Sequence, residues 1–248
     1  LIRYKLIILY LIIFLFLYNI IFKLDKKLVH KTIYVSLVLQ IITTIISLRG
    51  FGVKLNEQDS VLQDILKLET GVQIVEAFVY LWITYSLNNF DTMISRRYTD
   101  WFITTPLMLL STVIFMKYNL YKERNDHRKV TFKNFLLEDS DNIKKIVILN
   151  ALMLIFGLLG EKRKINKTFS IMVGFVFFFW VFKLVYEEYV KGNETNKRLF
   201  YFVFIIWALY GFAAMTGDNL KNISYNGLDL IAKNFYGLYI YYKIVQLK

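Results

Sequence analysis

Charged side chains inside long apolar segments are the residues of this chain best placed for chemistry. In the C-terminal segment Asp229 precedes Lys233 by four residues, and Asn222 and Asn226 precede them at similar steps. Residues three or four positions apart share one face of a helix. Ionisable residues inside a membrane cost a few kcal/mol each on insertion scales, so they indicate a functional site. The alternative is a structural ion pair that holds two helices together.

A second polar row, near the middle of the chain, offers a cation, an anion and two hydroxyls on one helix face. Its members are Arg97, Asp100, Thr104 and Ser111. Pro106, the only proline of the chain, lies within this row, where it removes a backbone donor and bends the helix. We expect the hydroxyls of Thr104 and Thr105 to bind the carbonyls that the proline frees.

Seven apolar segments must position these rows. A helix needs about 20 residues, at roughly 1.5 Å each, to cross a hydrocarbon layer of about 30 Å. The apolar runs are continuous, whereas the strands of a membrane barrel alternate between lipid-facing and lumen-facing residues, so we predict helices. The predicted spans are 33–50, 66–89, 96–117, 143–160, 167–190, 198–217 and 221–245.

The composition agrees with a multi-span membrane protein. The chain has 248 residues, of which 56% are hydrophobic, and a net charge of +12. A soluble domain is about 45–50% apolar, so this chain must separate its charge from its apolar surface. The basic residues lie between the spans, which argues against a nucleic-acid partner. With no cysteine and two histidines, we expect no metal site.

The connections between spans predict the orientation. The connection between the third and fourth spans is rich in lysine and arginine, whereas residues 88–95, before the third span, include neither. The basic residues are Lys117, Lys122, Arg124, Arg128, Lys129 and Lys133. Basic connections face the cytoplasm, which places the C-terminus on the cytoplasmic side. The basic cluster at 162–167 lies on the opposite side, against this trend.

An eighth apolar segment, at residues 6–22, precedes the seven spans. No cleavage site of the Ala-x-Ala kind follows it, so we expect a retained helix rather than a signal peptide. We therefore divide the chain into an N-terminal apolar helix or anchor at 1–25 and a seven-helix domain at 26–248.

Together the two polar rows resemble the microbial (type 1) rhodopsins. The motifs that carry this resemblance are Arg97-Tyr98-x-Asp100-Trp101-x-x-Thr104-Thr105-Pro106-Leu107 and Asp229-x-x-x-Lys233. The resemblance covers residues 30–246 and implies an all-α, bacteriorhodopsin-like bundle that is not an enzyme. It implies all-trans retinal bound covalently to Lys233 as a protonated Schiff base. It also implies that Asp100 and Asp229 are counterions, that Asp100 accepts the proton, and that Arg97 steadies both.

The same resemblance implies a retinal pocket. The expected lining residues are Trp101, Thr105, Met108, Met153, Gly157, Trp207, Tyr210 and Ala232. Asn150 stands where many members of the family have a polar residue in the fourth helix. Gly211 and Ala214 depart from the family, which commonly has proline and a bulky aromatic residue there, so the ring end of the pocket is not specified.

The residues Asp100, Thr104 and Ser111 resemble the signature of a viral branch of the family. Familiar proton pumps have a carboxylic acid at the position of Ser111, and serine has no proton to lend at neutral pH. Two other spans carry polar stripes at helical spacing, which could line an ion pathway. The stripes are Ser36, Gln40, Thr43 and Ser47, and Glu69, Gln73, Glu76, Tyr80 and Thr84.

We therefore predict a photoreceptor that moves ions across a membrane in response to light, acting as an outward proton pump. The alternative is a light-gated cation channel, and a light sensor that signals through a partner is a third hypothesis. The predicted ion pathway contains Glu69, Glu76, Gln40 and Asn226. The expected partners are the lipid bilayer of a plasma or host-cell membrane and the transported protons or cations, and homo-oligomerisation is left open.

Overall fold

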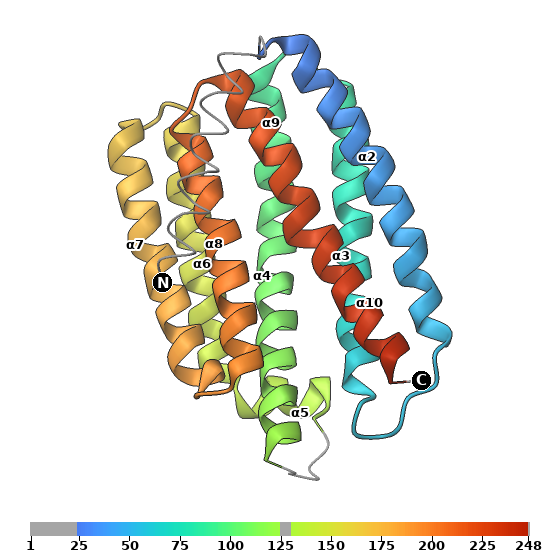
Figure 1. Cartoon of the computed structure of the whole chain (residues 1–248). Helices are drawn as coiled ribbons and strands as arrows, with labels where there is room; N and C mark the ends of the chain where they lie inside the picture. The colour runs from blue at the N-terminus through green and yellow to red at the C-terminus, as the bar shows by residue number, and fades with distance from the viewer. Residues whose placement is uncertain (1–23, 125–129, 248) are drawn as a thin grey trace.

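Seven antiparallel helical segments form one bundle in the computed structural model, which describes residues 24–124 and 130–247 (Figure 1). The described residues contain helices and no strands. The single-helix segments are α2 (Lys26–Arg49), α3 (Val61–Thr84), α4 (Phe90–Glu123), α6 (Ser140–Glu161) and α8 (Glu194–Ala214). The fifth segment joins α7 (Lys167–Val185) to η2 (Tyr186–Val190). The seventh joins α9 (Asp218–Asp229), the π-helical η3 (Leu230–Phe235) and α10 (Tyr236–Gln246), and the short α5 (Phe132–Glu138) precedes α6.

Aspartate and asparagine side chains begin four of the long helices. The Asp25 carboxylate accepts from the Leu28 amide before α2, and the Asn89 side chain accepts from the Thr92 amide before α4. Asn166 and Asn193 do the same for α7 and α8. Each cap satisfies a backbone donor that the first turn of a helix leaves free. Local sequence therefore sets where these helices start.

Among residues 24–124 and 130–247, five segments have the length and mean hydropathy of membrane spans. They are Lys26–Gly52, Phe90–Glu123, Ser140–Glu161, Lys167–Val190 and Glu194–Ala214. The helices α3 and α9 instead bury charged and amide side chains inside the bundle. Large apolar side chains point outward, for example Phe78 (69% exposed) and Trp180 (57% exposed), as expected for helices that face lipid.

The helix α4 lies in the middle of the bundle, between two groups of helices (Figure 1). The helices α2, α3, α9 and α10 pack on one side of it and contain the predicted polar stripes. The helices α6, α7 and α8 lie on the other side, where the buried side chains are mostly aromatic and aliphatic. The fold thus separates a polar half from an aromatic half.

The C-terminus, α5 and the connection between α2 and α3 lie at the same end of the bundle (Figure 1). Asp59 anchors this connection to α4, because its buried carboxylate accepts hydrogen bonds from the Tyr118 hydroxyl and from Lys122 Nζ at 3.1 Å. Burial raises the pKa of Asp59, but the hydrogen bonds from Tyr118 and Lys122 outweigh it and leave that pKa below its ordinary value.

The prediction of a seven-helix bundle is confirmed, but several span ends and the role of two threonines are wrong. The first helix begins at Lys26 rather than 33, and α3 covers Val61–Thr84 rather than 66–89. The third span is longer than predicted, because α4 runs from Phe90 to Glu123. The hydroxyls of Thr104 and Thr105 bind the carbonyls of Asp100 (2.9 Å) and Trp101 (2.7 Å). Pro106 has no N–H to donate to the carbonyl of residue 102, four positions earlier. The two threonines donate to the carbonyls of residues 100 and 101, so they do not replace the hydrogen bond that the proline removes.

The predicted helix at 6–22 lies outside the described residues. The division of the chain at residue 25 therefore stays a prediction. Within the described residues, α2 begins directly after that boundary, at Lys26.

Candidate functional site

Lys233 lies inside the bundle among three carboxylates from three helical elements. Its Nζ forms an ion pair with Asp100 of α4 and lies 3.7 Å from Asp229 Oδ1 and 3.6 Å from Glu76 Oε1 of α3. All four side chains are at most 2% exposed. A buried charge is tolerated only where opposite charges and hydrogen bonds replace water. The two predicted rows therefore meet at Lys233, and α3 adds a third acid.

The carboxylate of Asp229 is held by four groups. Its Oδ2 accepts from the Tyr80 hydroxyl at 2.7 Å and from Arg97 Nη1 at 3.2 Å. Its Oδ1 accepts from the Tyr210 hydroxyl at 2.8 Å and from the Trp101 indole at 3.3 Å. Hydrogen bonds of this kind fix the orientation of a carboxylate. Asp229 is thus a positioned carboxylate beside Lys233.

Arg97 closes the side of the site that faces the start of α9. Its guanidinium is 1% exposed, donates to Asn226 Oδ1 and lies over the rings of Tyr80 and Tyr225, at 5.2 and 5.8 Å from their centroids. Asn226 in turn donates to the Thr32 hydroxyl of α2 at 2.7 Å. Hydrogen bonds therefore connect Arg97 of α4, through Asn226 of α9, to Thr32 of α2.

Glu76 belongs to a hydrogen-bonded chain that crosses three helical elements. Asn234, the residue after Lys233, donates to Glu76 Oε2 at 2.8 Å, and the Thr43 hydroxyl of α2 donates to Asn234 Oδ1. Sequence reasoning missed Asn234 because it lies off the row defined by Asp229 and Lys233. Its one signal was an amide in an apolar segment.

Ser111 and Glu69 form a second contact between α3 and α4. The Ser111 hydroxyl contacts Glu69 Oε1, and both side chains are fully buried. Ser111 stands at a position where proton pumps commonly have a carboxylic acid. The fold brings the carboxyl group of Glu69, from α3, next to it. Thr104, between Ser111 and Asp100 in the same row, is also fully buried.

The two predicted stripes face each other across the interior. Their buried members are Ser36, Gln40, Thr43 and Ser47 of α2, and Glu69, Gln73, Glu76 and Tyr80 of α3. Thr84 is part-exposed near the end of α3 and bonds the Leu81 carbonyl at 2.6 Å, so it is not part of the buried stripe. We call the buried members, with Asn226 and Asn234, the polar file.

Several buried atoms of the polar file have no hydrogen-bond partner among the described residues. They are both amide atoms of Gln40 and of Gln73, Ser47 Oγ, Glu69 Oε2 and Glu76 Oε1. A buried polar atom without a partner costs about 1–3 kcal/mol, and such atoms in native proteins usually bind water. The polar file therefore has the chemistry of a hydrated path.

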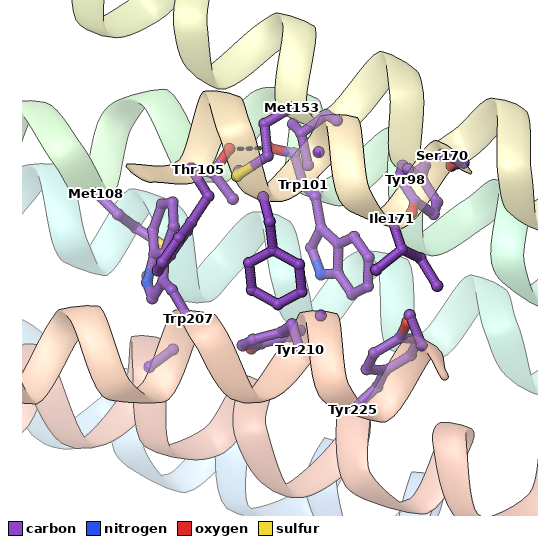
Figure 2. A pocket seen from close by; sticks show the side chains of 18 of the residues that line it. Tyr98, Trp101, Thr105, Met108, Met153, Ser170, Ile171, Trp207, Tyr210 and Tyr225 are labelled. Carbon is purple, nitrogen blue, oxygen red and sulfur yellow. Dashed lines mark hydrogen bonds between the residues drawn. The ribbon is translucent and has the colours of Figure 1, made fainter. Parts of the chain in front are cut away.

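The aromatic half contains a cavity (Figure 2), and Lys233 is one of its lining residues. It is lined by all of the residues that the sequence suggested for it: Trp101, Thr105, Met108, Met153, Gly157, Trp207, Tyr210 and Ala232. Among its described lining residues, Lys233 is the charged one. Asn150 donates to the Thr105 hydroxyl at 2.8 Å and so supports the wall. The cavity suits an apolar molecule with a polar group at Lys233.

Phe175 of α7 accounts for one of the two departures, Gly211, in the wall of this cavity. A Cβ built on Gly211 would lie 2.5 Å from Phe175 Cζ, so the phenyl ring occupies the space that a larger side chain at position 211 would need. Ala214 lines the same region. Sequence reasoning missed Phe175, because its contact with Gly211 joins two different helices.

The chain matches one family model, described as bacteriorhodopsin-like protein, over residues 31–247. It is similar to the crystal structure of viral rhodopsin OLPVRII, with 29% identity, a TM-score of 0.76, and coverage of 89% of this chain and 99% of that chain. Two other similar structures show the fold alone. For a blue light-absorbing proteorhodopsin from Med12 the identity is 19%, the TM-score 0.67 and the coverage 88% and 96%. For the proton pumping rhodopsin AR2 from the marine alga Acetabularia acetabulum these values are 17%, 0.68, 90% and 98%.

No curated protein sequence matches this chain.

Proposed function

Because this chain belongs to the bacteriorhodopsin-like family of retinal-binding, multi-pass membrane proteins, we propose that it is a photoreceptor that conducts cations when illuminated. The observation that carries this proposal is the polar file, with its buried acids Glu69 and Glu76 and with amides that find no partner in the part of the chain that the structure describes. The sequence alone favoured the pump, and the file between α2, α3 and α9 shifts our preference to the channel.

We propose all-trans retinal as the chromophore, bound to Lys233 as a protonated Schiff base. When bound there, retinal supplies absorption of visible light and a light-induced change of shape. The residues present fit such a group. Trp101 and Trp207 line an apolar cavity (Figure 2), Lys233 is among its lining residues, and the carboxylates of Asp100 and Asp229 lie beside the Lys233 amine.

The residues around Lys233 close the polar file in the dark. Glu76, Asn234 and Thr43 join α3, η3 and α2 across the middle of the path. Since Asn234 follows Lys233 directly, a displacement of Lys233 also displaces Asn234 and weakens its bond to Glu76. Separation of these side chains opens the path between α2 and α3, and the two acids of α3 attract cations to it.

An outward proton pump is the second candidate, and the contact between Ser111 and Glu69 favours it. In this role Asp100 accepts a proton from Lys233, to which it is paired. Glu69 then returns a proton to Lys233 from the side opposite Arg97. It is a buried acid in contact with Ser111, and the serine itself has no proton to give at neutral pH. Asp100 then releases its proton on the side of Asp229, where Arg97 holds the Asp229 carboxylate and the Asn226 amide in place without itself taking up the proton.

Voltage-clamped membranes under illumination test both candidates. A channel gives a photocurrent that reverses with the cation gradient, whereas a pump gives an outward current at zero driving force. Absence of any photocurrent would refute both and leave the light sensor. We also propose, from the basic connection between the third and fourth spans, that the C-terminus is cytoplasmic. An epitope tag at that end should then bind antibody only after the cells are permeabilised.

Loss of the visible absorption band in Lys233→Ala tests the chromophore site separately. A variant that kept the band would refute the assignment of Lys233.

A further inference from the structure

Gly237 marks a close approach between α10 and α3. A Cβ built on Gly237 would overlap Nε2 of Gln73, and it would lie 3.2 Å from Gln73 Cδ and 3.8 Å from Glu69 Cβ. Because Gly237 has no side chain, the Gln73 amide can pack directly against the backbone of α10.

Gln73 lies between the two acids of α3. It follows Glu69 by four residues and precedes Glu76 by three, and all three side chains are fully buried. Neither amide atom of Gln73 has a hydrogen-bond partner among the described residues. A buried amide without a partner destabilises a fold, whereas an apolar side chain of similar size at the same position would stabilise it. The glutamine at position 73 therefore indicates that its amide binds a polar ligand.

We propose that the Gln73 amide, held against Gly237, is the constriction of the cation path between Glu69 and Glu76 and sets the size of cation that passes. This inference rests on the proposed channel function. The carboxylates on either side attract a cation, while the neutral amide offers an oxygen ligand without trapping the ion by charge. Conduction needs such a balance, with binding strong enough to enter and weak enough to leave.

Gln73→Ala tests the constriction by widening it. In voltage-clamped cells we expect the permeability of a large organic cation, tetramethylammonium, relative to sodium to rise about tenfold, which corresponds to a barrier lower by about 1.4 kcal/mol. A ratio equal to that of the wild type would overturn the proposal. The visible absorption band of the variant, measured first, shows that it has folded.

Gly237→Ala tests the same contact from the other helix. The added methyl displaces the Gln73 amide into the path, so we expect the sodium photocurrent per folded protein to fall about tenfold. Gly71→Ala on α3 is the matched control, because a Cβ there meets no atom of the described residues within 4 Å, and it should conduct like the wild type. In Gln73→Ala/Gly237→Ala there is no amide to displace, so the current should recover.

An equal loss of current from Gly237→Ala with and without Gln73 would overturn the inference. If Gly237→Ala does not fold, the permeability ratio of Gln73→Ala decides alone. A wild-type photocurrent that does not reverse with the cation gradient refutes the channel function and the inference with it. A wild-type channel whose size limit is unchanged by Gln73→Ala refutes the inference only.

Discussion

A buried ion pair between α6 and α9 offers a sharp test of how this bundle is held together. Lys221 Nζ lies 2.7 Å from Glu161 Oε2, and the two side chains are 2% and 6% exposed. Lys221 also lies 3.0 Å from Asp218 Oδ1, whose side chain is 53% exposed. The perturbation is the removal of one partner at a time, with Lys221→Met and Glu161→Leu, and then of both together.

The structure makes the two single variants unequal. Lys221→Met leaves the Glu161 carboxylate buried without its cation, and breaking a buried pair in this way costs about 3–5 kcal/mol of unfolding free energy. Glu161→Leu leaves Lys221 with Asp218, so we expect a smaller loss of about 1–3 kcal/mol. The double variant replaces both charges by apolar groups, which is often neutral, so it should be more stable than Lys221→Met.

Unfolding in mixed micelles, followed by helical circular dichroism, measures these three free energies against the wild type. The visible absorption band of each variant before unfolding is the control for a native starting state. The double-mutant cycle then gives the coupling between Lys221 and Glu161.

Two results would refute this reasoning. The first is a loss below about 1 kcal/mol for Lys221→Met, which is the value of an exposed ion pair. The second is additivity in the cycle, because independent effects would show that the two residues do not stabilise each other.

Three further predictions concern other parts of the bundle. Because the pKa of Asp59 is lowered in the folded state, its contribution to stability is present above about pH 4 and is lost as the pH falls through the folded pKa. The stability difference between the wild type and Asp59→Asn should therefore shrink in acid. Denaturation midpoints of the two proteins that change in parallel with pH would contradict this. Gly211→Ala should cost about 1–3 kcal/mol of stability and slow retinal binding through overlap with Phe175, and Phe175→Leu should relieve both, as measured by regeneration of the absorption band. Asn234→Ala should raise the dark current by freeing Glu76, and an unchanged dark current would remove Asn234 from the closed state.

The sequence determined the bundle and the two polar rows. Spacing by three and four residues places Asp229 with Lys233, and Asp100 with Thr104, on one helix face each, whatever the rest of the fold does. Charge is costly in lipid, so these faces turn inward, as the burial of Lys233 and Asp100 shows. Span ends were less accurate, since caps such as Asn89 extend a helix beyond its apolar stretch.

Only the tertiary structure decided which residues of different helices meet. Glu69 with Ser111, Gln73 with Gly237, and Lys221 with Glu161 each join positions far apart in the sequence. Such contacts depend on the rotation of each helix about its axis and on its shift along its neighbour. The packing of the whole bundle sets both, and helical periodicity within one segment carries no information about either.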